Sequence, residues 1–373
     1  MTAVPVTTGS TPGPRTPGST EAGTVTGHPP YERRAIPEEV WTRAVAAVQG
    51  ATTVALACHV SPDGDALGSM LGFGLALRAA GKEVVASFGD RRFAVPRLLR
   101  FLPGQDLLVE PARYPAAPDV MLTFDASTME RLGLLAPNAG KAGELIVVDH
   151  HVSNTRFGSL HLVDPSVAAT TVLVEEFIGR LGLGAAGDHA DRGDRVDGDI
   201  ATCLYTGLVT DTGSFRYSST TPAVHVMAAR LVATGLRTDE IARELWDRSP
   251  FDYLKVLGAA LERVTLEADG AGGHGLVWTY VTRADRATTR LPYDEVEGVI
   301  DVVRKADEAD VAVVFKEDDA GVWQVSTRSK GAVDVGRACA ALGGGGHARA
   351  AGFTSHLPPE PALDRLRPLL GKA

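Results

Sequence analysis

Short apolar runs alternate with helix-spaced apolar positions along roughly the first two thirds of the chain. The runs predicted as strands are 53–60, 82–88, 120–127 and 144–151. The segments with helical spacing are 36–50, 65–81, 168–182 and 198–210. Strands that are apolar on both faces and separated by helices form sheets covered on both sides. This order therefore predicts an α/β domain with a mostly parallel sheet flanked by helices.

The domain organisation follows from where this alternation stops. The stretch 237–254 breaks the pattern and is predicted as a linker, so that the larger domain spans 36–236. A second, smaller α/β pattern covers 255–373, and we expect a cleft between the two domains. Residues 1–35 are rich in Pro, Gly and Thr and predict a disordered tail. The polar, acidic stretch 185–199 predicts an exposed loop.

Composition excludes several classes of protein. The formal net charge is −9, which disfavours long duplex nucleic acid as the main ligand but not a small phosphate compound in one pocket. No apolar run approaches the ~20 residues of a membrane span, and the N-terminal segment lacks the apolar core of a secretory signal. The three cysteines lack CxxC spacing, which favours a cytoplasmic protein without a disulfide frame.

Aspartates and histidines occur at or just after the ends of three of the predicted apolar strands and of one predicted helix. They are His59, Asp63, Asp65, Asp125, Asp149, His150, His151 and Asp211. Taken singly, Asp63 and Asp65 are more simply explained as helix-capping acids, and His59 as a packed histidine. Because the carboxyl ends of parallel strands gather at one edge of a sheet, the whole set instead predicts one site there.

The residue types select the chemistry of this site. Asp and His ligands without Cys suit Mn²⁺ or Mg²⁺ and disfavour a structural zinc. About six ligands exceed what one catalytic ion with open positions needs, whereas two ions about 3.5–4 Å apart and bridged by a carboxylate would use them all. Asp125 stands alone at the end of its strand and is the expected bridge.

A glycine cluster in the second domain gives a separate signal. Gly343, Gly344, Gly345 and Gly346 precede His347. Four successive glycines expose backbone N–H groups to which phosphate can come close, and Arg328, Lys330 and Arg349 supply cations nearby. The simpler alternative is a flexible glycine-rich loop, which the adjoining histidine and arginines disfavour.

These motifs resemble those of a known family. HVSPDGDALGS, LTFDAS, VVDHH and GLVTDTGSFRY are similar, in that order, to the four motifs of the DHH phosphoesterases. STRS and GGGGHARAAGF resemble the DHHA1 domain. Together they cover about residues 36–360, and the layout is most similar to the bacterial oligoribonuclease and 3′-phosphoadenosine-5′-phosphate (pAp) phosphatase group of the NrnA type.

The resemblance implies a role for each matching position. One Mn²⁺ would be bound by His59, Asp63 and Asp125, and the second by Asp65, Asp125, His150 and Asp211. Asp149 would orient the neighbouring ligands, and His151 would face the scissile phosphate or the metal-bound water. The nucleotide's other end would be bound by Arg328, Ser329, Gly343, Gly344, Gly345, Gly346 and His347.

The resemblance also implies the reaction, in which water activated between two metal ions hydrolyses short single-stranded RNA, pApA, pAp or cyclic di-AMP. It further implies a homodimer. Three alternatives remain at this point. They are an exonuclease of the RecJ kind acting on longer single strands, a family II inorganic pyrophosphatase, and a non-catalytic nucleotide sensor. The complete set of candidate ligands disfavours the sensor, and GGGGH disfavours the pyrophosphatase.

Overall fold

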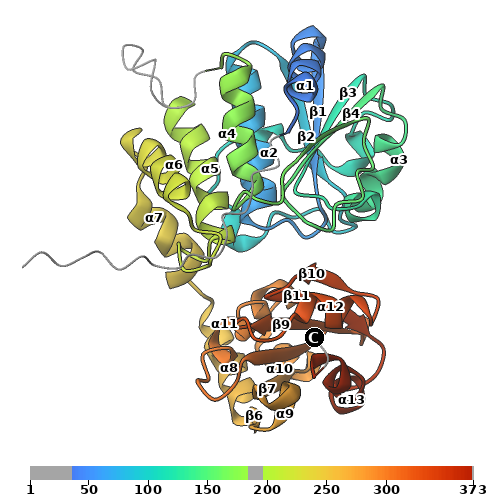
Figure 1. Cartoon of the computed structure of the whole chain (residues 1–373), viewed down its shortest axis with the longest axis vertical. Helices are drawn as coiled ribbons and strands as arrows, with labels where there is room; N and C mark the ends of the chain where they lie inside the picture. The colour runs from blue at the N-terminus through green and yellow to red at the C-terminus, as the bar shows by residue number, and fades with distance from the viewer. Residues whose placement is uncertain (1–35, 184–195, 372–373) are drawn as a thin grey trace, which may run out of the picture. The chain divides into compact units, whose positions relative to one another are not determined.

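The structure is a computed structural model that describes residues 36–183 and 196–371 (Figure 1). The predicted tail at 1–35 and most of the predicted loop at 185–199 lie outside the described residues. Within them, the predicted α/β fold class is confirmed, with one parallel sheet flanked by helices and a second sheet in the C-terminal part of the chain.

The first sheet has five strands in the order β2-β1-β3-β4-β5, and all of its neighbouring pairs are parallel. The strands are β1 (Thr53–Cys58), β2 (Glu83–Phe88), β3 (Val120–Phe124), β4 (Glu144–Asp149) and β5 (Leu160–Val163). β5 was not predicted as a strand. Three predicted strands extended two or three residues too far, because the ionisable residues at their ends belong to the loops that follow.

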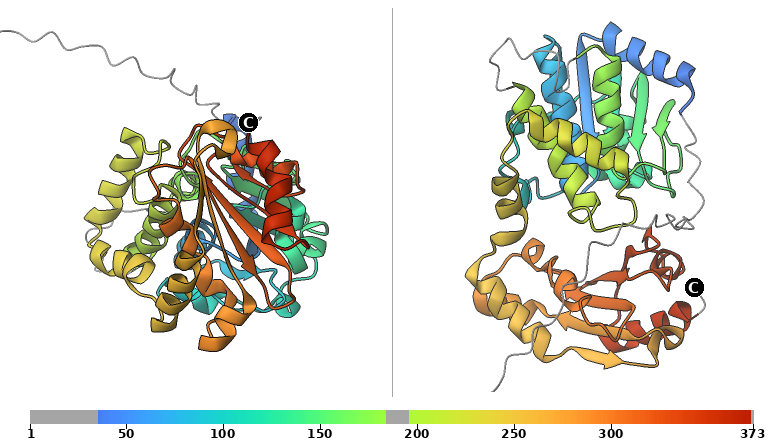
Figure 2. Two further views of the ribbon diagram at one scale, coloured as in Figure 1. Left: turned by 90° about the horizontal axis from the view of Figure 1, so that it is seen from below. Right: turned by 60° about the vertical axis from the view of Figure 1, so that its left-hand side comes forward.

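Helices cover both faces of this sheet. The main elements are α1 (Glu38–Gly50), α2 (Gly64–Ala79), α4 (Thr170–Arg180), α5 (Val196–Asp211) and α6 (Pro222–Ala233), with η4 (Met129–Leu135) and α3 (Ala136–Ala139). Along β1, Leu56 packs into the core beneath α2, α4 and α5, whereas Ala57 packs into the smaller core beneath η4 and α3. Figures 1 and 2 show α2, α4 and α5 side by side.

The close packing of α2 on α5 positions the acids of the site. A Cβ atom at Gly68 of α2 would clash with the carbonyl oxygen of Cys203 on α5, so only glycine allows the observed approach. A Cβ atom at Gly207 would lie 2.9 Å from Oδ1 of Asp65. The two helices therefore pack antiparallel, and the start of α2 lies against the end of α5, where Asp211 is the last residue.

Between the two sheets, the chain continues through short connecting elements. These are α7 (Thr238–Ala242), a π-helical turn η5 (Arg243–Asp247) and α8 (Phe251–Glu262). The stretch predicted as the linker, 237–254, is thus helical over most of its length. The domain boundaries at 236 and 255 stay predictions.

The second sheet is mixed and has the order β10-β11-β9-β8-β7-β6. Its strands are β6 (Thr265–Glu267), β7 (Leu276–Val281), β8 (Val311–Glu317), β9 (Trp323–Ser329), β10 (Gly345–His347) and β11 (Ala350–Ser355). The helices around it are α9 (Gly270–Gly273), α10 (Arg283–Thr289), α11 (Val299–Val303), α12 (Val335–Ala340) and α13 (Pro359–Leu370). Along β8, Val313 packs into one core and Val314 into the other, so both faces of this strand are buried.

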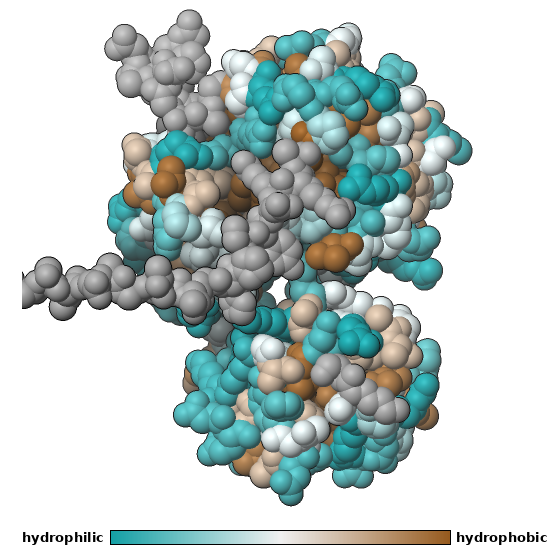
Figure 3. All heavy atoms as spheres, in the orientation of Figure 1, coloured by the Kyte–Doolittle hydropathy of each residue, from teal (hydrophilic) through white to brown (hydrophobic). Residues whose placement is uncertain are grey.

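One face of the molecule is shown by the hydropathy of its residues in Figure 3. Figure 3 shows hydrophilic side chains over most of the face in view, with hydrophobic ones scattered among them. Among the described residues, no helix is long and apolar enough to cross a membrane.

Candidate metal centre

The structure brings all six predicted metal-binding positions together at the carboxyl edge of the first sheet. His59 follows β1, Asp125 follows β3, and His150 follows β4. Two groups of three form, and within each group one potential ligand atom per residue lies within 4.8 Å of the others. The groups are His59, Asp63 and Asp125, and Asp65, His150 and Asp211.

In the first group, an imidazole lies between two carboxylates. Nε2 of His59 is 3.7 Å from Oδ2 of Asp63 and 3.5 Å from Oδ2 of Asp125. Asp63 also caps α2, because its Oδ1 accepts hydrogen bonds from the backbone N–H groups of Asp65 and Ala66 at 3.1 and 3.0 Å. One oxygen of Asp63 therefore serves the helix, and the other remains for the site.

Asp125 joins the first group to the second. Its Oδ1 lies 3.6 Å from Nε2 of His150, while its Oδ2 faces His59. Nε2 of His150 also lies 3.1 Å from Oδ2 of Asp211 and 3.9 Å from Oδ2 of Asp65. Asp125 adopts a left-handed backbone conformation, with φ of 57°. Strained backbone at a strand end often accompanies a functional role.

The N-terminus of α4 holds two of these carboxylates, a feature that the sequence analysis missed. The backbone N–H groups of Thr170 and Thr171 donate to Asp65 at 2.6 and 3.0 Å. The hydroxyl of Thr170 donates to Oδ1 of Asp125 at 2.9 Å. Helix N-termini stabilise anions in this way. The acids are thus fixed by a segment far along the chain.

The closely spaced, buried carboxylates of the centre favour the binding of cations. Burial and the charges of Asp125 and Asp211 raise the pKa of Asp65 well above its ordinary value. Burial lowers the pKa of His59, but hydrogen bonds and charge from Asp125 and Asp63 raise it to about 10. Buried carboxylates stay charged only when paired. Oxygen and imidazole ligands at these separations fit divalent ions such as Mn²⁺ or Mg²⁺.

Asp149 is fully buried and organises the residues that follow it. Its Oδ1 accepts hydrogen bonds from Nδ1 of His151 at 2.7 Å and from the backbone N–H of His150 at 2.9 Å. Its Oδ2 accepts from the side-chain amide of Asn154 at 2.6 Å. The predicted supporting position of Asp149 is consistent with these contacts, whereas Asn154 was not anticipated.

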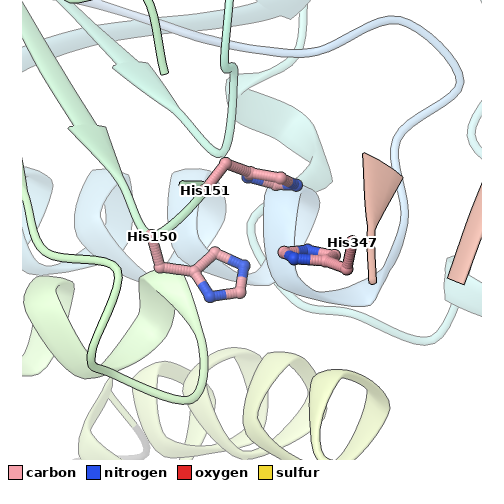
Figure 4. A group of neighbouring side chains, drawn as sticks. All are labelled: His150, His151 and His347. Atoms are coloured by element: carbon pink, nitrogen blue, oxygen red, sulfur yellow. The ribbon is translucent and has the colours of Figure 1, made fainter. Parts of the chain in front are cut away.

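His347, at the end of β10, lies beside the two histidines that follow β4. Its ring centroid is 4.7 Å from that of His151, with nearly parallel planes, and 5.5 Å from that of His150 (Figure 4). The three imidazoles form a further group with nitrogens within 4.8 Å of one another. Of the predicted nucleotide-binding residues, His347 is the one that these contacts connect to the metal centre.

Arg328 and Ser329 lie on opposite faces of β9, because side chains alternate along a strand. Ser329 is buried, and its hydroxyl donates to Asp310 at 2.8 Å and accepts from the backbone N–H of Gly331 at 2.9 Å. Arg328 is half-buried, and its guanidinium donates to the carbonyl of Thr327 at 3.0 Å. These contacts favour a structural role for Ser329 and leave Arg328 the better placed of the two for an anion.

The glycine cluster forms a helix end and a hairpin strand. The backbone N–H of Gly343 donates to the carbonyl of Ala340 at 3.0 Å, and that of Gly344 to the carbonyl of Cys339 at 2.9 Å, which ends α12. Gly345 and Gly346 pair with β11, and Gly346 has a φ of 135° that L side chains rarely adopt. The N–H groups of Gly343 and Gly344 are therefore engaged within the chain.

Comparison with protein families gives two matches. A model described as "DHH family, N-terminal domain" matches residues 53–208, and one described as "DHHA1 domain" matches residues 283–371. The first range contains seven of the eight ionisable positions of the centre, and Asp211 lies three residues beyond it. The second contains the predicted nucleotide-binding residues.

Individual proteins are similar over most of the chain. The "Bifunctional oligoribonuclease and PAP phosphatase NrnA" of Thermus thermophilus is 34% identical over 83% of this chain and 85% of its own length. The protein of the same name from Bacillus subtilis is 27% identical over 80% and 88%. A crystal structure of an exopolyphosphatase-related protein from Bacteroides fragilis superposes with a TM-score of 0.78 at 24% identity, covering 91% of this chain and 97% of that one, which shows a shared fold.

Proposed function

The chain belongs to the DHH family of phosphoesterases, and from this premise we propose that it hydrolyses short oligoribonucleotides and pAp with two bound divalent metal ions. The sequence-based prediction of a hydrolase with DHH and DHHA1 domains is confirmed by the family matches and by the Thermus relative. The substrates are inferred from the names of the relatives. The number and identity of the ions are inferred from the ligands.

One observation carries the proposal. Asp125 presents one carboxylate oxygen to His59 and the other to His150, and so connects two groups of ligands. A carboxylate shared between two ligand sets is the arrangement that paired metal ions require. We propose that His59, Asp63 and Asp125 bind one ion, and that Asp65, Asp125, His150 and Asp211 bind the other.

When bound, the ions would supply Lewis-acid charge to the phosphoryl oxygens and acidify the attacking water. The remaining steps belong to the protein's own side chains. Asp149 accepts a hydrogen bond from Nδ1 of His151. Burial lowers the pKa of His151, but this hydrogen bond and the charge of Asp125 raise it above its ordinary value, so that Nε2 can also carry a proton and donate it to a phosphoryl oxygen. Thr170 fixes the orientation of the Asp125 carboxylate through its hydroxyl, so that both oxygens keep their directions.

We propose that the other end of the substrate is bound by Arg328 and His347, with the exposed backbone of Gly345 nearby on β10. A guanidinium and an imidazole suit a second phosphate group. Five carboxylates at the centre and a net charge of −9 disfavour a long polyanion, because each added phosphate adds repulsion. This charge distribution supports short substrates. A homodimer and a preference for Mn²⁺ over Mg²⁺ stay predictions.

The proposal is tested by comparing kcat/KM for pAp, pApA, a short RNA and cyclic di-AMP with Mn²⁺. Inorganic pyrophosphate and a long single strand serve as comparison substrates in the same assay. We expect turnover of at least one of the short nucleotides well above that of either comparison substrate. Preferred hydrolysis of the long strand or of pyrophosphate would contradict the proposed substrate class.

A further inference from the structure

Arg131 lies beside the first ligand group but has no role in the function proposed so far. It belongs to η4, six residues beyond Asp125, and its side chain is exposed. Its Nη2 is 3.1 Å from Nδ1 of His59. Its backbone is fixed on both sides, because its carbonyl accepts from Val60 N–H at 2.8 Å and its N–H donates to Thr128 at 3.2 Å. The backbone of Arg131 is therefore anchored at the edge of the metal centre, and its guanidinium lies beside His59.

Among the described residues, Arg131 forms no ion pair, although several carboxylates of the centre lie nearby. Within the described residues, no carboxylate lies within 4.0 Å of its guanidinium, and no Lys or Arg forms an ion pair with a carboxylate of the centre. In the same part of the chain, Arg131 is the one lysine or arginine whose side chain lies within hydrogen-bonding distance of a predicted ligand. Burial raises the pKa of Asp90, and the charge of Arg131 is near enough to lower it, but no ion pair forms between the two.

When His59 is in the form that binds a metal, its Nδ1 atom cannot accept a hydrogen bond from the guanidinium of Arg131. Nδ1 of His59 also lies 2.8 Å from the carbonyl oxygen of Val60, which can only accept. A neutral ring with Nε2 free for a metal carries its proton on Nδ1 and donates it to that oxygen. Nδ1 of His59 then has no lone pair for Arg131, whose N–H groups are available to another acceptor.

We propose that Arg131 is a phosphate-binding residue, which donates hydrogen bonds to a non-bridging oxygen of the substrate phosphoryl group on the His59 side of the centre. This inference rests on the proposed function. A guanidinium presents a planar fork of donors that matches the spacing of phosphate oxygens. It also offsets the carboxylate charge that a substrate phosphate meets on approach. Because phosphoryl oxygens gain charge in hydrolysis, the contact strengthens as the reaction proceeds.

The test compares Arg131→Gln and Arg131→Lys with the wild type and with Arg113→Gln, which replaces an exposed arginine on the separate short helix η3 (Pro111–Arg113). For the Gln variant we expect kcat/KM for pApA to fall about a hundredfold, as for loss of one preorganised donor. Inhibition by inorganic phosphate should weaken in parallel. Arg131→Lys should retain part of both, and Arg113→Gln should match the wild type.

Measurements of Mn²⁺ affinity and Tm distinguish two roles of Arg131, namely binding of the substrate phosphate and positioning of the ligand His59. We expect both to stay near wild-type values in Arg131→Gln. Unchanged kcat/KM and unchanged phosphate inhibition would overturn the inference. It would also be overturned if the variant bound Mn²⁺ weakly and recovered full activity at saturating Mn²⁺. If the wild type hydrolysed no nucleotide, the proposed function would fail, and calorimetric binding of phosphate to the Mn²⁺-loaded wild type and variant would still decide the role of Arg131.

Discussion

Nδ1 of His151 donates a 2.7 Å hydrogen bond to Oδ1 of the fully buried Asp149. The pair fixes the tilt of the His151 ring and keeps one proton on Nδ1, and by favouring the imidazolium form it lets Nε2 carry a second proton. A histidine oriented in this way presents Nε2 in one direction, as the proposed contact with the phosphoryl group requires.

Asp149→Asn should therefore lower activity without unfolding the protein. An amide of the same shape cannot accept from His151, His150 and Asn154 as the carboxylate does, so the ring loses its fixed orientation. We expect kcat for pApA to fall about 10- to 100-fold, the usual cost of removing such a supporting carboxylate. Steady-state kinetics at saturating Mn²⁺ measure this, and a wild-type kcat would show that the hydrogen bond has no catalytic role.

Thr170 and Thr171 offer a matched pair of substitutions. The hydroxyl of Thr170 donates to Asp125, whereas the buried hydroxyl of Thr171 has no hydrogen-bond partner among the described residues. Thr170→Val should weaken Mn²⁺ binding about tenfold, because Asp125 loses a donor that orients it. Thr171→Val should leave Mn²⁺ affinity unchanged and be neutral or stabilising, because it removes an unsatisfied polar atom. Calorimetric titration with Mn²⁺ checks both, and equal effects would refute the assigned difference.

The close approach of α2 and α5 predicts a strong effect of a single methyl group. In Gly68→Ala the added Cβ atom would meet the carbonyl oxygen of Cys203, which cannot move aside without shifting α5. We expect the free energy of unfolding to fall by about 1–3 kcal/mol. Gly179→Ala on α4, where nothing lies within 4 Å of the new Cβ atom, is the control and should be neutral or slightly stabilising. Denaturant titration measures both, and a Gly68→Ala variant as stable as the control would contradict the packing described.

The ion pair of Arg263 and Asp285 predicts how stability depends on pH. Nη2 of Arg263 lies 2.6 Å from Oδ1 of Asp285. Although burial raises the pKa of Asp285, hydrogen bonds from Arg263 and Thr282 lower it from 3.8 to about 2. Because the folded pKa is the lower one, the unfolded state takes up the proton first as pH falls. The stabilisation is complete above about pH 4 and is lost towards pH 2.

Asp285→Asn removes this group and provides the comparison. The difference in free energy of unfolding between wild type and variant should be largest above pH 4 and should shrink as the pH approaches 2. Denaturant titrations at several pH values give this difference directly. A difference that stays constant over this range would contradict the lowered pKa of Asp285.

The sequence grouped the residues that the structure brings together because they follow apolar strands or lie at helix ends, positions that the alternation of apolar and polar residues makes visible. The parallel sheet was likewise evident from apolar runs between helices. The supporting contacts could not be seen in this way, since Thr170 reaches Asp65 across 105 residues and Asp125 across 45. The pair of threonines just before an apolar helical pattern was the available signal, because such residues commonly begin helices.

The second sheet was harder to interpret. Arg328 and Ser329 were grouped as neighbours in sequence, yet alternation along β9 places them on opposite faces. The four glycines suggested a phosphate loop, whereas the structure uses Gly343 and Gly344 to end α12 and the next two to form β10. Glycine permits both outcomes, so composition alone does not distinguish a binding loop from a tight hairpin.

The central claim is that hydrolysis requires the carboxylate of Asp125, which is shared between the two proposed metal sites. Its most direct test is the initial rate of pApA hydrolysis with Mn²⁺ by Asp125→Ala, beside the wild type and at temperatures where both remain folded. Because Asp125 contributes an oxygen to each ligand group, the account predicts that the rate falls to background while the fold persists. Near-normal turnover by this variant would contradict it.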